Sequence, residues 1–209
     1  MPDTAFMITA FVTMFVVIDP IGLAPLFVAM TRGMPANLRR RIALRATLVG
    51  VFVLLAFAIF GEALLSFIGI SMPAFRVSGG ILLFLTALDM LFERRTKRRE
   101  DRSDEDDQDD PSVFPLAIPL IAGPGAIASV ILLIGQRPGL EGTVTVLGAT
   151  GLVMIIVVAF FLASGLIERA LGKTGITVVT RLMGMLLAAL SVQFVLDGLS
   201  AFGFGPGAG

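Results

Sequence analysis

The sequence contains no cysteine, histidine, tryptophan or tyrosine. Without cysteine the chain can form neither a disulfide nor a thiolate metal site. Without histidine it lacks the usual proton carrier near neutral pH and the commonest metal ligand. Tryptophan and tyrosine usually mark the membrane–water interfaces, so only phenylalanine is left for that position. Nothing in the chain resembles a nucleophile–base pair, and we expect neither an enzyme nor a bound cofactor.

Charge is also scarce. Charged residues make up 15% of the 209 residues, whereas about 25% is usual in soluble proteins. Hydrophobic residues make up 56% of the chain, and its mean hydropathy is +0.94. A soluble fold of this length cannot hide so much apolar surface from water. The composition therefore predicts an integral membrane protein.

Stretches of about 20 apolar residues, the length of a membrane-crossing helix, recur six times. We therefore predict an all-α membrane protein with six transmembrane helices. The predicted spans are Thr4–Met30, Ile42–Phe60, Ala74–Phe92, Val113–Gly135, Thr143–Ile167 and Ile176–Ser200. The longest connection, residues 93–111, begins with a basic block and continues as an acidic one, and we expect it to be disordered.

Basic residues gather in alternate connections, after the first, third and fifth spans. They are Arg32, Arg39, Arg40, Arg41, Arg45, residues 94–102, Arg169, Lys173 and Arg181. The other connections and both termini hold only Arg76 and Arg137. Because positively charged loops stay in the cytoplasm, both termini are predicted to face the periplasm or exterior.

The two halves of the chain share a pattern of helix breakers. Residues 17–24 align with residues 121–128, and residues 76–82 align with residues 181–187, at nearly one offset. The two halves enter the membrane from opposite sides, so we interpret the pattern as a 3+3 inverted repeat, a known plan of secondary transporters. The alternative is convergent apolar sequence with shared breakers. The predicted divisions are 1–92, a charged cytoplasmic loop at 93–112, 113–203 and a tail at 204–209.

The breakers interrupt the first and fourth spans. Asp19 followed by Pro20 is typical of a helix cap and a first helical residue, and Gly123-Pro124-Gly125 is the matching break. Groups freed by a break must be buried in protein or line a wet cavity. A half-helix N-terminus attracts a substrate carboxylate at Gly123–Gly125, whereas Asp19 attracts an ammonium group or a coupling cation. The alternative is that Asp19 only caps and the prolines only kink.

Other residues in the spans complete the candidate binding set. Arg76 and Arg181 occupy equivalent repeat positions and either snorkel to lipid headgroups or contact substrate. Gln193 lies deeper and either bonds across helices or contacts substrate. The remaining candidates are Gly22, Pro25, Ser78, Gly79 and Gly184. For Ser78, Gly79 and Gly184, close helix packing is the favoured interpretation.

Several motifs carry a resemblance to a known family. They are Asp19-Pro20-Ile21-Gly22 with Pro25 and Phe27, then residues 76–82, 119–127, 180–184 and 193–198. At these positions the chain resembles the MarC family, over nearly all of residues 1–203. The resemblance implies a six-span bacterial inner-membrane protein, similar to neutral amino acid transporters and grouped with the lysine-exporter superfamily.

We therefore expect a secondary transporter or exporter of small neutral amino acids. The chain has no nucleotide-binding motif, so coupling to H⁺ or Na⁺ is the natural energy source. Two alternatives remain open: transport of another small solute, and a non-transporting membrane partner or regulator. The lipid bilayer is the expected surrounding, nucleic acid is not an expected partner, and the sequence leaves oligomerisation open.

Overall fold

The computed structural model describes residues 4–92 and 111–204, and these residues form helices and no strand. The elements are α1 (Thr4–Ile18), α2 (Pro20–Met30), α3 (Ala36–Ile68), α4 (Met72–Leu91), η1 (Ser112–Ile121), α6 (Pro124–Gln136), α7 (Leu140–Leu162) and α8 (Ser164–Ala201). The predicted all-α class is confirmed. The charged loop predicted to be disordered lies almost wholly outside the described residues, as does most of the predicted tail.

Within residues 4–92 and 111–204, five helical segments are long and apolar enough to cross a bilayer, and η1 with α6 makes a sixth if its 50° bend belongs to one span. The predicted number of spans therefore agrees with the structure. Several predicted bounds are wrong. Helix α3 has 33 residues and exceeds the predicted Ile42–Phe60 at both ends. Helix α7 ends at Leu162, and α8 begins at Ser164 with a break at Gly172. The prediction followed hydropathy, whereas helical hydrogen bonding continues into the polar interface.

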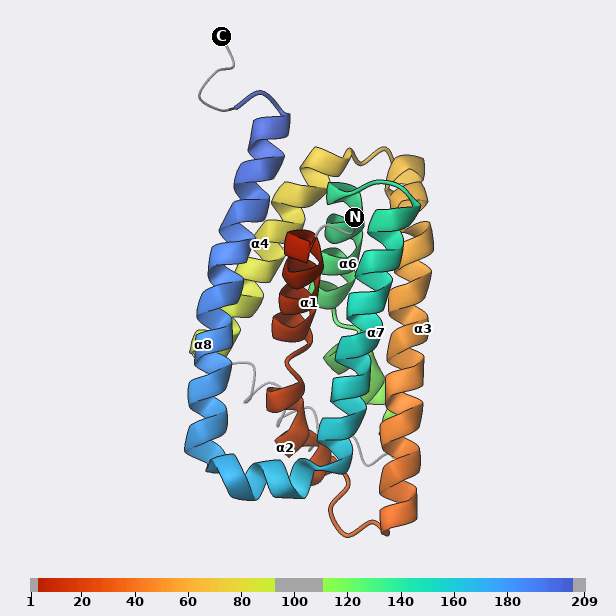
Figure 1. Ribbon diagram of the computed structural model, residues 1–209, viewed down its shortest axis with the longest axis vertical. Helices are drawn as coiled ribbons and strands as arrows, with labels where there is room; N and C mark the ends of the chain where they lie inside the picture. Colours follow the sequence, from red (N-terminus) through yellow and green to blue (C-terminus); the bar gives the residue numbers. More distant parts are fainter. Residues whose placement is uncertain (1–3, 93–110, 205–209) are drawn as a thin grey trace.

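The helices form two outer pairs with two interrupted segments between them (Figure 1). Helices α4 and α8 pack against each other on one side, and α3 and α7 pack together on the other. The α1–α2 and η1–α6 segments lie between these pairs, and both ends of the described chain point toward the same end of the bundle. Each half of the chain thus has one interrupted segment followed by two long helices. The inverted repeat itself stays a prediction.

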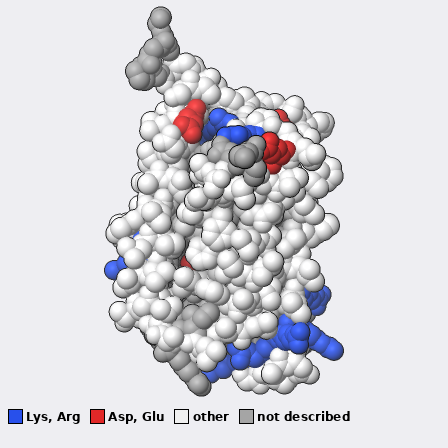
Figure 2. All heavy atoms as spheres, in the orientation of Figure 1, with Lys and Arg blue, Asp and Glu red and all other residues white. Residues whose placement is uncertain are grey.

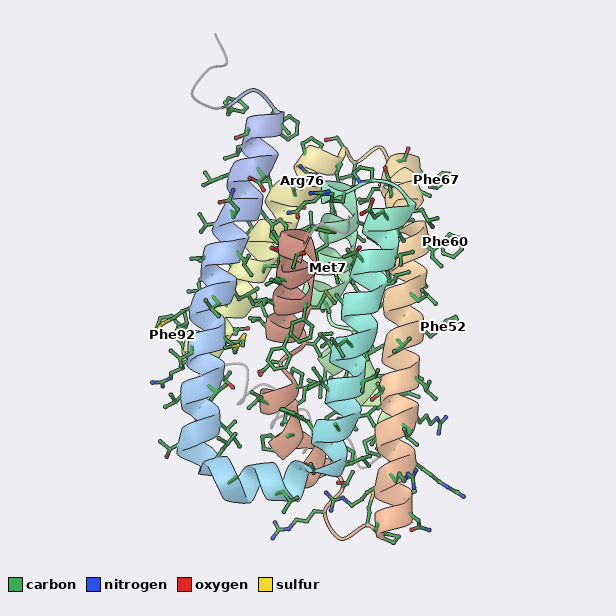
Figure 3. The ribbon with its side chains drawn as sticks, in the orientation of Figure 1. Met7, Phe52, Phe60, Phe67, Arg76 and Phe92 are labelled. Carbon is green, nitrogen blue, oxygen red and sulfur yellow. The ribbon has the colours of Figure 1, made fainter. Side chains whose placement is uncertain are left out.

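The outer face of α3 carries large apolar side chains that no other helix covers. Phe52, Phe60 and Phe67 point away from the bundle (Figure 3) and are 65% to 90% exposed. A water-facing surface of this kind is a liability, whereas lipid is as apolar as these rings. Figure 2 shows basic residues at the α2–α3 end, charges of both signs at the other end, and a wide, almost uncharged band between them. This distribution fits a helix bundle that crosses a bilayer.

Glycines allow α4 and α8 to approach closely. A Cβ atom added at Gly80 would lie 2.8 Å from the backbone oxygen of Ser191, and one at Gly184 would lie 3.2 Å from that of Ala87. Small residues at such contacts are typical of membrane helices, which associate through close packing. The structure therefore places Gly184 in a helix contact, as the packing interpretation requires. Gly79 likewise packs against α6, where an added Cβ would lie 2.8 Å from Leu132.

Candidate functional site

The first break lies at Asp19, between α1 and α2. Asp19 adopts the left-handed conformation (φ 57°, ψ 64°), which Asp and Asn tolerate better than most side chains. Its carboxylate accepts a hydrogen bond of 3.0 Å from the Gly22 N–H, and Pro20 is the first helical residue. The predicted helix cap is confirmed. The carboxylate is also buried, because Asp19 is only 2% exposed.

The sequence around Asp19 holds its carboxylate over the start of α2. A Cβ atom at Gly22 would collide with Asp19 Oδ2, so glycine at that position leaves room for the capping carboxylate. Pro20 has no N–H, so the carbonyl of Val16 lacks its usual helical donor. The negative end of the α1 dipole and the Asp19 carboxylate therefore meet at this break. Pro25 lies further into α2, away from the break.

The chain leading to the second break is not a regular helix. Within η1, Phe114 and Ile118 have extended backbone conformations, and each precedes a proline. The predicted span over Val113–Gly135 is therefore regular only from Pro124 onward. Irregular backbone at membrane depth needs cover from protein. Leu116 and Ile121 are fully buried, which places the inner side of η1 in the core.

The start of α6 has no side chain at its cap. Gly123 is the capping residue, Pro124 is the first helical residue, and no side chain hydrogen-bonds to this end, as predicted. An added Cβ at Gly123 would lie 2.5 Å from the Pro119 oxygen, so the chain turns too tightly for a larger residue. Gly125 is buried beside α4, where an added Cβ would lie 3.6 Å from the hydroxyl oxygen of Thr86. The helix N-terminus carries a partial positive charge.

The two breaks lie at the same depth in the bundle. Helices α1 and α6 are in contact and run in opposite directions (Figure 1). Val17 approaches to 3.4 Å of the Cβ position of Gly125. Asp19 lies two residues after Val17 at the end of α1, and Gly123 lies two residues before Gly125 at the start of α6. A carboxylate-capped break and a break without a capping side chain therefore lie side by side.

The structure places other predicted candidates away from the breaks. An Nη atom of Arg76 donates a 2.7 Å hydrogen bond to the carbonyl of Gly135 at the end of α6, near one end of the bundle (Figure 3). A cation at a helix C-terminus complements the helix dipole. Arg181 lies on the exposed surface of α8. Neither arginine is brought to the breaks.

The polar side chains Gln193 and Ser78 also lie apart from the breaks. Gln193 is exposed and donates a 2.7 Å hydrogen bond to Asp197, one turn further along α8, so this bond stays within one helix. Ser78 is exposed and donates to the carbonyl of Phe75. The breaks thus bring together Asp19, Gly22 and Gly123–Gly125, whereas Arg76, Ser78 and Gln193 serve other contacts.

Three hydroxyl residues near the breaks were not among the predicted candidates: Thr86, Thr13 and Ser129. Thr86 lies beside Gly125, and Thr13 and Ser129 are fully buried in α1 and α6. Their only signal in the sequence is a hydroxyl in an apolar span. Threonine and serine are ordinary in membrane helices, because the hydroxyl can bond to its own backbone. Only the packing of the helices distinguishes these three.

A bundle of apolar helices with two interrupted segments that meet at one depth defines a multi-pass integral membrane protein. Residues 4–202 match the model for the MarC family integral membrane proteins. The chain belongs to this family, which confirms the resemblance found in its motifs.

Relatives align with this chain over nearly its whole length. A UPF0056 membrane protein of Aquifex aeolicus is 38% identical over 195 residues, which cover 92% of this chain and 91% of the relative. The UPF0056 membrane protein YvbG of Bacillus subtilis is 35% identical and covers 93% and 94%. The UPF0056 inner membrane protein YhgN of Escherichia coli is 34% identical and covers 92% and 95%. No solved structure matches the chain.

Proposed function

We propose that the protein is a secondary transporter of small neutral amino acids in the inner (plasma) membrane. The observation that carries this proposal is the meeting of two breaks of opposite character. Asp19 supplies a buried carboxylate at one break, and the start of α6 at Gly123 supplies backbone N–H groups without a capping side chain at the other. A zwitterion matches this arrangement, with its ammonium group toward Asp19 and its carboxylate toward α6.

The residues around the two breaks favour a small substrate. Gly22, Gly123 and Gly125 bring backbone close to the site without adding side-chain volume, and Val17 and Leu83 supply apolar walls near Gly125. An uncharged side chain suits these walls, because burial of a further charge would need a further partner. Glycine, alanine and serine are therefore the substrates of choice.

Alternating access in secondary transporters with broken helices uses a fixed site near the midplane, which is where half-helix ends bind substrate and coupling ions. The negative end of α1 and Asp19 together suit a monovalent cation as well as an ammonium group. Coupling to H⁺ or Na⁺ would thus act through the same carboxylate that receives the substrate amine. This arrangement supports the secondary-transport mechanism over one that depends on a nucleotide.

The test is counterflow of labelled alanine in liposomes that contain the purified protein. We expect alanine inside the vesicles to drive uptake of labelled alanine, and D19A to abolish uptake while the protein remains folded. R40A, which changes an exposed arginine of α3, is the matched control and should transport normally. Absence of counterflow with glycine, alanine and serine in correctly folded protein would reject amino acid transport.

A further inference from the structure

The contact between α1 and α6 contains two buried hydroxyl groups, those of Thr13 and Ser129. Both residues are 0% exposed, and neither hydroxyl has a hydrogen-bond partner within the described part of the chain. Two other buried threonines in this fold behave differently. Thr47 donates to the carbonyl of Ala43 at 2.9 Å, and Thr150 donates to the carbonyl of Val146 at 2.8 Å. Another buried hydroxyl without a partner among the described residues, that of Thr180, lies in α8. Thr13 and Ser129 are distinguished from it because both belong to the α1–α6 contact.

Thr13 and Ser129 belong to the facing sides of α1 and α6. Val17 of α1 touches the position of Gly125 on α6, and the two helices are antiparallel. Residues four apart lie on one face of a helix. Thr13 therefore lies on the face of α1 that meets α6, and Ser129 lies on the face of α6 that meets α1. Both lie one turn from the Val17–Gly125 contact, on the side away from the breaks.

A buried hydroxyl without a partner destabilises the state that contains it, and an apolar residue of the same shape avoids this cost. Unpartnered groups in native structures call for an explanation, such as a functional role in another state. Helix α1 ends at one break and α6 begins at the other, and the regular helical hydrogen bonding stops at both. Each can therefore move relative to the segment beyond its break.

We propose that Thr13 and Ser129 form a polar subsite of the transport path, lying between the breaks and the membrane face opposite the α2–α3 connection. When α1 and α6 separate, the two hydroxyls bind the hydrogen-bonding groups of a small polar solute and its water. The identity of the solute rests on the proposed function. The position of the path rests on the two hydroxyls themselves.

Isosteric substitutions test the subsite. T13V and S129A remove the hydroxyls with little change of shape, so each should raise the melting temperature by about 2–4 °C. Each should also slow alanine counterflow about tenfold, because a tenfold change corresponds to the loss of about one hydrogen bond to the solute. T47V removes a hydroxyl that already bonds to Ala43 and should not raise the melting temperature. Wild-type counterflow in both T13V and S129A would overturn the proposal.

Single cysteines locate the path independently of any substrate. The natural chain contains no cysteine, so T13C and S129C need no altered background. A membrane-impermeant thiol reagent is applied to each membrane face in turn, both with and without alanine. We expect both cysteines to react only from the face opposite the α2–α3 connection. M14C and V130C are the controls, because Met14 and Val130 are equally buried neighbours, and these should stay unlabelled.

The outcomes separate the subsite from the proposed function. If T13C and S129C are labelled but the protein shows no alanine counterflow, the proposed path is supported and amino acid transport is rejected. If T13C and S129C stay unlabelled in vesicles that transport alanine, the proposed path is rejected and the proposed transport function is supported. Labelling from the α2–α3 face, or labelling equal to that of M14C and V130C, would also overturn the proposed path.

Discussion

The guanidinium of Arg39 donates a 3.3 Å hydrogen bond to the hydroxyl of Ser164, 125 residues further along the chain. Its Nε donates to the hydroxyl of Thr31 at 3.1 Å, and the group lies 5.7 Å from the ring centroid of Phe27. Phe27 in turn stacks on Phe161, with the ring centroids 4.5 Å apart. One arginine at the start of α3 thus joins the end of α2 to the α7–α8 connection.

Replacing this arginine should weaken the bundle at that end. In R39K, the ammonium group cannot reproduce the planar fork that reaches two hydroxyls and stacks on a ring. We expect the free energy of unfolding to fall by about 1–2 kcal/mol. The measurement is chemical unfolding in detergent. R40K changes an exposed neighbour and should alter stability by less than about 0.5 kcal/mol. Equal effects of the two substitutions would contradict the joining role of Arg39.

The charge of Asp19 can be separated from its capping role. Asparagine caps helices as well as aspartate does and also tolerates positive φ. We therefore expect D19N to unfold at nearly the wild-type temperature but to lose alanine counterflow, because the substrate amine or coupling cation loses its carboxylate. If D19N transported alanine at the wild-type rate, Asp19 would be a cap and nothing more.

Substitution of glycine by alanine should have opposite effects on stability at Gly123, in the tight turn before α6, and at Gly148, within the regular helix α7. In G123A, the new Cβ would meet the Pro119 oxygen at 2.5 Å, so the turn into α6 must distort and stability must fall. In G148A, within α7, no atom lies within 4 Å of the new Cβ, and the helix should gain about 0.5–1 kcal/mol. Thermal unfolding of both variants in detergent checks this. A stabilised G123A protein would show that the turn has room for a side chain.

The position of Arg76 predicts a loss of stability without a loss of substrate affinity. R76M removes the hydrogen bond to the Gly135 carbonyl and leaves the end of α6 without its cation. We expect the free energy of unfolding to fall by about 1–3 kcal/mol. The concentration of alanine that gives half-maximal counterflow should stay within about twofold of wild type, a difference of under 0.5 kcal/mol. A large rise in that concentration with unchanged stability would instead place Arg76 in the substrate site.

Local chemistry explains why the breaks could be predicted. Asp19 caps α2 because its short side chain reaches the Gly22 amide, and Pro20 begins the helix because it has no N–H to satisfy. Both effects act within four residues. The same holds for Gly123 and Pro124. Such positions can be identified wherever the neighbouring sequence is known.

The contacts of the Arg76 and Gln193 side chains were harder to predict, because they depend on which helices face each other. In a soluble protein the apolar face of a helix marks its core side. In a membrane, lipid is as apolar as the core, so hydropathy does not separate buried faces from lipid-facing ones. The sequence therefore left Gln193 open to substrate, to another helix or to its own helix, and packing selected Asp197.

The sequence by itself determined that this chain crosses a membrane, that its first and fourth spans break at Asp19 and at Gly123, and to which family it belongs. Composition, proline and glycine chemistry and motif spacing all act without reference to distant residues. Only the tertiary structure decided that the breaks at Asp19 and Gly123 share one depth, that Arg39 reaches Ser164, and that Thr13 and Ser129 are buried at the contact between α1 and α6. Those relationships depend on the register of helices far apart in the chain, which apolar faces in a lipid solvent specify too weakly to be read from sequence.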